Sequence, residues 1–178
     1  LKYIRFNSDE SVFIDPIVCS QQTMQSLQKR LLLLYTGLTR RAHDILGEQS
    51  RNTIGDVEKR AALGRMVGLA RQLREALVEN DIDGFGEILH ANWMEKRQLA
   101  RGITQPCIDE WYDTARTHGA IGGKILGAGG GGFLLVYAPI DRHREICQAL
   151  PNLRRIPFHF EAQGSKLIYV EENGYGDR

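Results

Sequence analysis

Cysteine is scarce in this sequence of 178 residues, and its scarcity excludes a fold built on disulfides. Cys19, Cys107 and Cys147 stand far apart, and no two of them form a Cys-x-x-Cys pair. An odd and sparse set of cysteines is typical of a protein in a reducing compartment. No basic and then apolar leader opens the sequence, so nothing in it indicates secretion. We therefore expect a cytoplasmic protein.

Long apolar runs and an excess of one charge are also missing. The fullest apolar run, Leu31 to Tyr35, is far shorter than the roughly 20 residues that a membrane-spanning helix needs. The 23 Lys and Arg residues nearly balance the 22 Asp and Glu residues, which leaves no electrostatic footprint for nucleic acid or for an anionic membrane. We expect neither as a partner. The 42% of hydrophobic residues suffices for a core without metals or disulfides.

The order of the predicted elements indicates one α+β domain over residues 1–178. Two β-prone runs around a cluster of turn formers predict an opening hairpin, Lys2–Phe6 and Ser11–Asp15. Further strands are expected at Arg30–Tyr35, Ala120–Gly127, Phe133–Ala138, Ile156–Phe160 and Ser165–Val170. Helices are expected at Gln21–Lys29, 39–49, 56–77, 81–93, 104–115 and Arg142–Leu150, with Thr39, Asp56 and Asp81 as N-caps. This order favours a mainly antiparallel sheet with a layer of helices on one face.

The most distinctive segment is the glycine loop, Gly127-Ala128-Gly129-Gly130-Gly131-Gly132, between two predicted strands. Glycine costs roughly 0.5–1 kcal/mol relative to Ala in regular structure, so such a run is tolerated where φ must be positive or where another group approaches the backbone. The exposed N–H groups of such a loop make a concave anion site, suited to phosphate. The alternative interpretation is a tight connection that packs against another element and binds nothing.

Two common glycine motifs do not fit this loop. Gly127, Gly129 and Gly132 match G-x-G-x-x-G, but a dinucleotide fold needs a helix after the third glycine, and here the strand-like Phe-Leu-Leu-Val-Tyr follows. A Walker A loop needs Ser or Thr after Gly-Lys to hold Mg²⁺, and Ile125 stands there. The sequence therefore excludes a Rossmann dehydrogenase and a P-loop protein.

The segment from Lys124 to Phe133 resembles the third, C-terminal motif of the GHMP kinases, which phosphorylate galactose, homoserine, mevalonate and related small molecules. The longer string through Pro139, together with the upstream Tyr35 to Ala42, is similar to the D-glycero-D-manno-heptose 7-phosphate kinase branch. The resemblance implies a ferredoxin-like fold, ATP and Mg²⁺ as cofactors, and a glycine loop against the phosphates of the nucleotide or the sugar. It implies transfer of the γ-phosphoryl group of ATP to a hydroxyl of a sugar phosphate.

The sequence also departs from that family, because no stretch matches the Pro-x-x-x-Gly-Leu-x-Ser-Ser type loop of the N-terminal kinase half. Together with a first residue that is Leu1, this predicts a C-terminal half whose partner is the missing ATP-binding half. We expect no catalytic residue and no metal ligand in this chain, Mg²⁺ ligands mainly from the missing half, and no turnover by the chain alone. A homodimer through the surface meant for the partner is a further expectation.

Four residues outside the glycine loop are predicted to bind the substrate: Thr36, Gly37, Arg40 and Lys124. Arg40 follows a strand-to-helix junction, where a guanidinium fork assisted by a helix N-terminus holds a sugar phosphate. The alternative for Arg40 is a solvated charge, and for Lys124 a strand lysine that points to solvent. A second function also remains open, a non-catalytic α+β module that binds a phosphorylated metabolite through the glycine loop.

Overall fold

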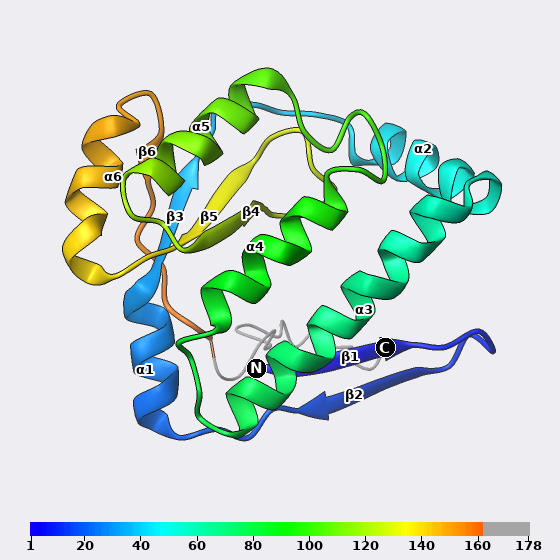
Figure 1. Cartoon of the computed structure of the whole chain (residues 1–178), viewed down its shortest axis with the longest axis horizontal. Helices are drawn as coiled ribbons and strands as arrows, with labels where there is room; N and C mark the ends of the chain where they lie inside the picture. Colours follow the sequence, from blue (N-terminus) through cyan, green and yellow to red (C-terminus); the bar gives the residue numbers. More distant parts are fainter. Residues whose placement is uncertain (162–178) are drawn as a thin grey trace, which may run out of the picture.

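A computed structural model describes residues 1–161 of the chain (Figure 1). The predicted strand Ser165–Val170 lies outside the described residues. The strands are β1 (Lys2–Phe6), β2 (Val12–Pro16), β3 (Leu31–Tyr35), β4 (Gly122–Ile125), β5 (Phe133–Tyr137) and β6 (Arg154–Arg155). The helices are α1 (Gln21–Arg30), α2 (Ala42–Gly55), α3 (Val57–Val78), α4 (Phe85–Lys96), α5 (Pro106–Thr117) and α6 (His143–Ala149), with a 3₁₀ turn at Ile140–Arg142.

The main sheet has the strand order β4-β5-β3-β6, and every neighbouring pair in it is antiparallel. In chain order, β3 is followed by α5, β4, β5, α6 and β6, with α2, α3 and α4 inserted before α5. This is the βαββαβ arrangement of ferredoxin-like domains. In the central pair, Leu31 lies opposite Tyr137 and Tyr35 lies opposite Phe133. The predicted α+β fold with a mainly antiparallel sheet is therefore confirmed.

The core lies between this sheet and the helices α5 and α6, which cover one of its faces (Figure 1). Side chains alternate along a strand, so Leu32 and Leu34 point to the same face, and each is 1% exposed. They share a buried cluster with Ile108 and Ala115 of α5 and Ile146 of α6. Because Leu31 and Tyr137 point to the opposite face, they belong to a second cluster with α1 and the ends of α3 and α4 that meet there.

Helices α3 and α4 lie side by side, and α4 crosses close to β4 (Figure 1). The closeness depends on two glycines, because a Cβ on Gly122 would lie 2.0 Å from the carbonyl oxygen of Gly86. Real Cβ atoms do not approach other atoms so closely, so a larger residue at Gly122 would push helix and strand apart. The β1–β2 hairpin lies beside α3, where the Arg74 guanidinium stands 5.4 Å from the centre of the Tyr3 ring.

The predicted N-caps have mixed outcomes. Asp56 caps α3, and its carboxylate accepts hydrogen bonds from the N–H groups of Glu58 and Lys59. Thr39 was the wrong cap for α2: the helix begins at Ala42 and continues to Gly55, past the predicted end, with Arg41 as N-cap. Asp81 was also wrong, because its carboxylate accepts from the N–H of Asp83 within a turn, and α4 begins after Gly84.

The strand predicted at Ile156–Phe160 is also wrong. Pairing with β3 is confined to Arg154 and Arg155, and a last backbone bond runs from the Ile156 N–H to the carbonyl of Leu33. Pro157 then has no N–H to continue the ladder. The chain turns toward α1, where the N–H of Phe160 donates to the Gln28 side chain at 3.0 Å. The alternation of apolar and polar residues that suggested a strand reflects packing of Phe158 and Phe160 against the second cluster.

Candidate phosphate-binding site at the glycine loop

The glycine loop connects β4 to β5 and rests on two distant segments of the chain. At its base, the N–H of Leu126 donates to the carbonyl of Phe133 at 2.9 Å. The N–H of Gly130 donates to Ile103, just before α5, and the N–H of Gly132 donates to Leu38, just after β3. These contacts fix the shape of the second half of the loop.

Gly129 shows why this half of the loop has no side chains. Its φ is +114°, a conformation that residues with a Cβ rarely adopt. A Cβ built there would lie 2.7 Å from both the Cα and the carbonyl oxygen of Ile103. Backbone, unlike a flexible side chain, has little room to give way, so the close approach of the two segments requires glycine.

The loop keeps part of its hydrogen-bonding capacity. The N–H groups of Gly130 and Gly132 are engaged as described above, whereas within residues 1–161 no protein acceptor is recorded for those of Gly127, Ala128, Gly129 and Gly131. Successive free N–H groups in a loop of positive φ form the kind of concavity that binds anions. The arrangement thus has the donors that a phosphate requires.

Thr36 and Gly37 shape the junction that faces this loop. Thr36 is 7% exposed, and its hydroxyl donates to the carbonyl of Gly132 at 2.9 Å while accepting from the N–H of Leu38. Gly37 follows with a φ of +71°, which turns the chain out of β3. Both hydrogen bonds of the Thr36 hydroxyl are made within the protein. Thr36 and Gly37 thus hold the β3–α2 junction against the glycine loop. Their predicted contact with substrate stays a prediction.

Arg40 and the glycine loop line a common cavity of about 260 Å³. Its lining residues come from the β3–α2 junction and from the loop with its flanking strand end: Leu38, Thr39, Arg40, Ala42, Leu126, Ala128, Gly129, Gly131 and Gly132. The sequence motifs around Arg40 and around the loop, nearly 90 positions apart, are therefore brought to one place. The cavity combines a guanidinium, free loop N–H groups and the apolar side chain of Leu126.

Gln105 is a further residue of this site, and sequence reasoning missed it. Its side-chain nitrogen donates to the carbonyl of Gly130 at 3.1 Å, and its side-chain oxygen lies 3.4 Å from the Nη2 of Arg40. It thus bridges the loop and the guanidinium from the start of α5, where it is the N-cap residue. A glutamine before Pro106 gives no signal in the sequence beyond helix initiation.

The start of α2 adds to the electrostatics of the cavity. Its N-cap, Arg41, makes no side-chain capping bond, and Ala42 in the first turn lines the cavity. The first N–H groups of a helix have no partner within the helix, and the helix dipole places partial positive charge there. Arg40 and this uncapped terminus therefore both favour an anion.

Lys124 lies on β4 and does not line the cavity, and Lys96 stands at the end of α4. The Lys96 ammonium donates to the carbonyl of Gly127 at 2.5 Å, at the first residue of the loop. Burial and the nearby charge of Lys124 lower the pKa of Lys96 to about 8. Burial also lowers the pKa of Lys124. Lys96 was not predicted, because a lysine in the last turn of a helix is common.

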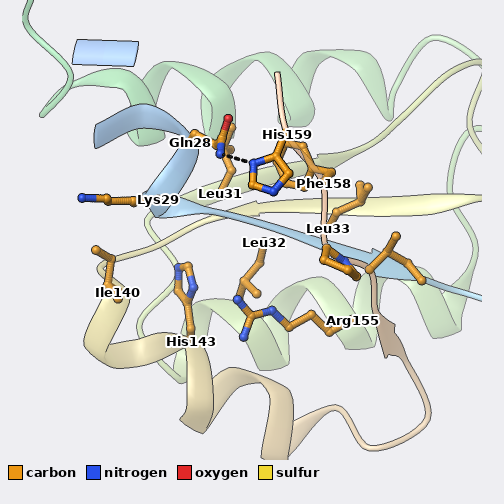
Figure 2. A pocket seen from close by; sticks show the side chains of 12 residues that line it. Gln28, Lys29, Leu31, Leu32, Leu33, Ile140, His143, Arg155, Phe158 and His159 are labelled. Atoms are coloured by element: carbon orange, nitrogen blue, oxygen red, sulfur yellow. Dashed lines mark hydrogen bonds between the residues drawn. The ribbon is translucent and has the colours of Figure 1, made fainter. Parts of the chain in front are cut away.

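A second hollow, of about 530 Å³, lies along the edge of β3 where β6 has ended (Figure 2). Leu32 and Leu33 form its apolar wall, and the side chain of Arg155 stands beside it. At one end Gln28 and His159 are hydrogen-bonded at 2.9 Å (Figure 2). None of the predicted site residues lines this hollow.

Residues 1–161 contain neither a cluster of metal ligands nor a helix that could span a membrane. Within this range, His, Cys, Asp and Glu side chains do not gather in groups of three or more that would hold a metal ion. Among the helices described, none combines the length and the apolar character that crossing a bilayer requires.

Comparison with known proteins relates part of the chain to a known family. Residues 73–153 match the family model described as GHMP kinases C terminal. These residues include the glycine loop, so the resemblance of the loop to that family is confirmed. In fold, the chain is similar to mevalonate kinase from L. major in complex with R-mevalonate, with a TM-score of 0.70, 22% identity, and coverage of 86% of this chain and 47% of that structure.

Two curated relatives are similar in sequence. The D-glycero-alpha-D-manno-heptose 7-phosphate kinase of Campylobacter jejuni is 26% identical over 148 residues, which cover 83% of this chain and 43% of the relative. The bifunctional fucokinase/GDP-fucose pyrophosphorylase of Arabidopsis thaliana is 31% identical over 137 residues, 76% of this chain and 13% of the relative. The chain thus spans less than half the length of these relatives.

Proposed function

We propose that this chain is the C-terminal part of an ATP-dependent sugar kinase that transfers the γ-phosphoryl group of ATP to a hydroxyl of heptose 7-phosphate. The observation that supports it is the shared cavity of Arg40 and the glycine loop. Its relatives named as kinases support phosphoryl transfer by the full-length protein. The N-terminal half would be the partner that completes the cleft.

Phosphoryl transfer depends on positioning and on neutralising charge. In this proposal the guanidinium of Arg40, oriented by Gln105, binds the phosphate that the sugar already bears. The free N–H groups of the glycine loop suit a phosphate group in the same way, so the chain has donors for the phosphates of ATP. In this proposal Mg²⁺ would be held mainly by the N-terminal half. The base that accepts the hydroxyl proton would also lie outside this chain.

The charge of the cavity favours a phosphorylated acceptor over a neutral sugar. An arginine beside a helix N-terminus gains most from a dianionic group, because charge-assisted and bidentate hydrogen bonds are about twice as strong as neutral ones. L-fucose offers no such group, and mevalonate offers a single carboxylate. Among the acceptors named for the relatives, a heptose phosphate therefore fits best.

Calorimetric titration of the chain tests this assignment. The ligands are D-glycero-D-manno-heptose 7-phosphate, L-fucose and mevalonate, each with and without Mg-ATP. We expect saturable binding of the heptose phosphate and at least tenfold weaker binding of the other two. Preferential binding of L-fucose or mevalonate would contradict the assignment. Heptose phosphate binding without phosphoryl transfer in the full-length protein would favour the non-catalytic module instead.

A further inference from the structure

Helix α4 and strand β4 run in the same direction past each other and bring two lysines to the entrance of the glycine loop. The two elements meet at Gly86 and Gly122, where a Cβ would collide. From there α4 covers ten residues to Lys96, about 15 Å at about 1.5 Å per residue. The strand and its exit cover five residues to Gly127, about 16 Å at about 3.3 Å per residue. The matched lengths explain why the Lys96 ammonium reaches the carbonyl of Gly127.

Neither lysine has a carboxylate to balance its charge within residues 1–161. The acidic groups of neighbouring elements are taken by arginines: Glu95 pairs with Arg65 at 2.8 Å, and Asp109 pairs with Arg97 at 2.9 Å. Lys96 and Lys124 are both partly buried. Two partly buried like charges repel each other and lose hydration, so their placement raises the free energy of the ligand-free protein.

Side chains alternate along a strand, so Lys124 lies on the same face of β4 as Gly122, the face that α4 crosses. Burial lowers the pKa of both lysines, and the charge of Lys124 lowers that of Lys96 further. A ligand that carries negative charge would raise the pKa of both lysines, because an opposite charge favours the ammonium form. Beside the Lys96 ammonium, the N–H of Gly127 has no protein acceptor in the described part of the chain.

We propose that Lys96 and Lys124 form a second phosphoryl-binding subsite at the first residue of the glycine loop, separate from the Arg40 cavity. Arg40 lies against Gly130, where a Cβ would come within 3.2 Å of its Cγ, whereas Lys96 contacts Gly127. The loop thus has a cationic group near each end. The existence of the subsite is independent of the acceptor sugar, and only the molecule that bears the phosphoryl group rests on the proposed function.

Site-resolved acylation of lysines tests the subsite without a kinase assay. The chain is treated with a limiting amount of an amine-acylating reagent at pH 8, with inorganic phosphate or with chloride at equal ionic strength, and labelling is quantified by mass spectrometry. We expect saturating phosphate to slow acylation of Lys96 and Lys124 at least fivefold. The matched control is Lys2, on the exposed β1 strand, whose labelling should change less than twofold.

The variant Arg40→Ala separates this proposal from the proposed function. Protection of the two lysines should persist in it, because the subsite does not use Arg40. Loss of the protection in Arg40→Ala would overturn the separate subsite, and so would acylation of both lysines that phosphate does not change in the unaltered protein. If phosphate protects the two lysines while heptose 7-phosphate fails to bind, the result supports the subsite and contradicts heptose 7-phosphate as the acceptor.

A second measurement uses substitution of the lysines. Phosphate affinity at this subsite, followed through the amide signal of Gly127 by nuclear magnetic resonance, should fall at least tenfold in Lys96→Met and in Lys124→Met. Lys2→Met removes the same charge and should leave the affinity within twofold. Unchanged affinity in the two loop variants would contradict the proposal.

Discussion

The first residue of the glycine loop, its open end, and the stretch from Gly129 to Gly131, its packed end, are held very differently. From Gly129 to Gly131 the loop is pressed against Ile103, Gly102 and Leu38, so closely that a Cβ would collide with backbone at each position. At Gly127 a Cβ would meet nothing within 4 Å. The packed end fixes the loop, and the open end leaves donors and space for a ligand. Glycines that look equivalent in the sequence therefore serve packing at one end and access at the other.

The largest effect should come from a substitution at the packed end. Gly129→Ala combines a φ of +114° with a contact of 2.7 Å to the Ile103 backbone. Backbone strain and overpacking together should lower the free energy of unfolding by about 3 kcal/mol. Urea denaturation followed by circular dichroism measures it. A loss below about 0.5 kcal/mol would show that the loop is not packed as described.

The pH dependence of stability tests the open end. The pKa of Lys96 is lowered to about 8 in the folded chain, from its ordinary value of 10.5. Between these two values the unfolded state binds more protons, so the contribution of Lys96 makes stability rise with pH from about 8 to about 10.5. The contribution of Lys96 is measured by comparing the urea midpoints of the unaltered chain and of Lys96→Met at pH 7.5 and at pH 10. An equal rise in both proteins would contradict the electrostatic account.

A substitution at the open end should cost much less than at the packed end. In Gly127→Ala the added Cβ has no atom within 4 Å, but the residue keeps a φ of +74°. The left-handed conformation should therefore lower the free energy of unfolding by about 1 kcal/mol. The same urea experiment gives the difference from Gly129→Ala directly. Equal losses in the two variants would remove the distinction between the ends.

The smallest effect is expected for the bridge between loop and arginine. Gln105→Ala removes one hydrogen bond to the carbonyl of Gly130 and the contact with Arg40, both at partly exposed groups. Heptose 7-phosphate affinity should fall about threefold, since a neutral hydrogen bond contributes about 1 kcal/mol or less. Isothermal titration measures this, with Gln98→Ala, a glutamine outside the cavity, as the control. An effect as large as that of Arg40→Ala would give Gln105 a direct contact with the ligand.

Local patterns in the sequence predicted much of the fold. A strand was predicted at Arg30–Tyr35, and β3, at Leu31–Tyr35, is an inner strand of the sheet. The N-cap at Asp56 was also predicted correctly. Each of these signals is local, because a cap or a buried strand depends on residues a few positions apart. The pairing of β6 is not local, and the alternation from Ile156 to Phe160 misled the prediction.

The candidate site was predictable where it has a motif and hidden where it depends on packing. The glycine loop and Arg40 stood out by composition and position, although their meeting in one cavity required the fold. Lys96 and Gln105 reach the loop from α4 and from the start of α5. Their sequence neighbours give no sign of this, since only the close crossing at Gly86 and Gly122 brings α4 to the loop.

The most direct test of the central claim compares two adjacent arginines. Arg40 lines the cavity beside the loop, whereas Arg41 is the N-cap residue and does not line it. Calorimetric titration with heptose 7-phosphate should show at least a tenfold loss of affinity in Arg40→Ala, as expected for a charge-assisted hydrogen bond of about 1.5–3 kcal/mol. Arg41→Ala should stay within threefold of the unaltered chain. Equal losses in the two variants, or none in Arg40→Ala, would contradict the account.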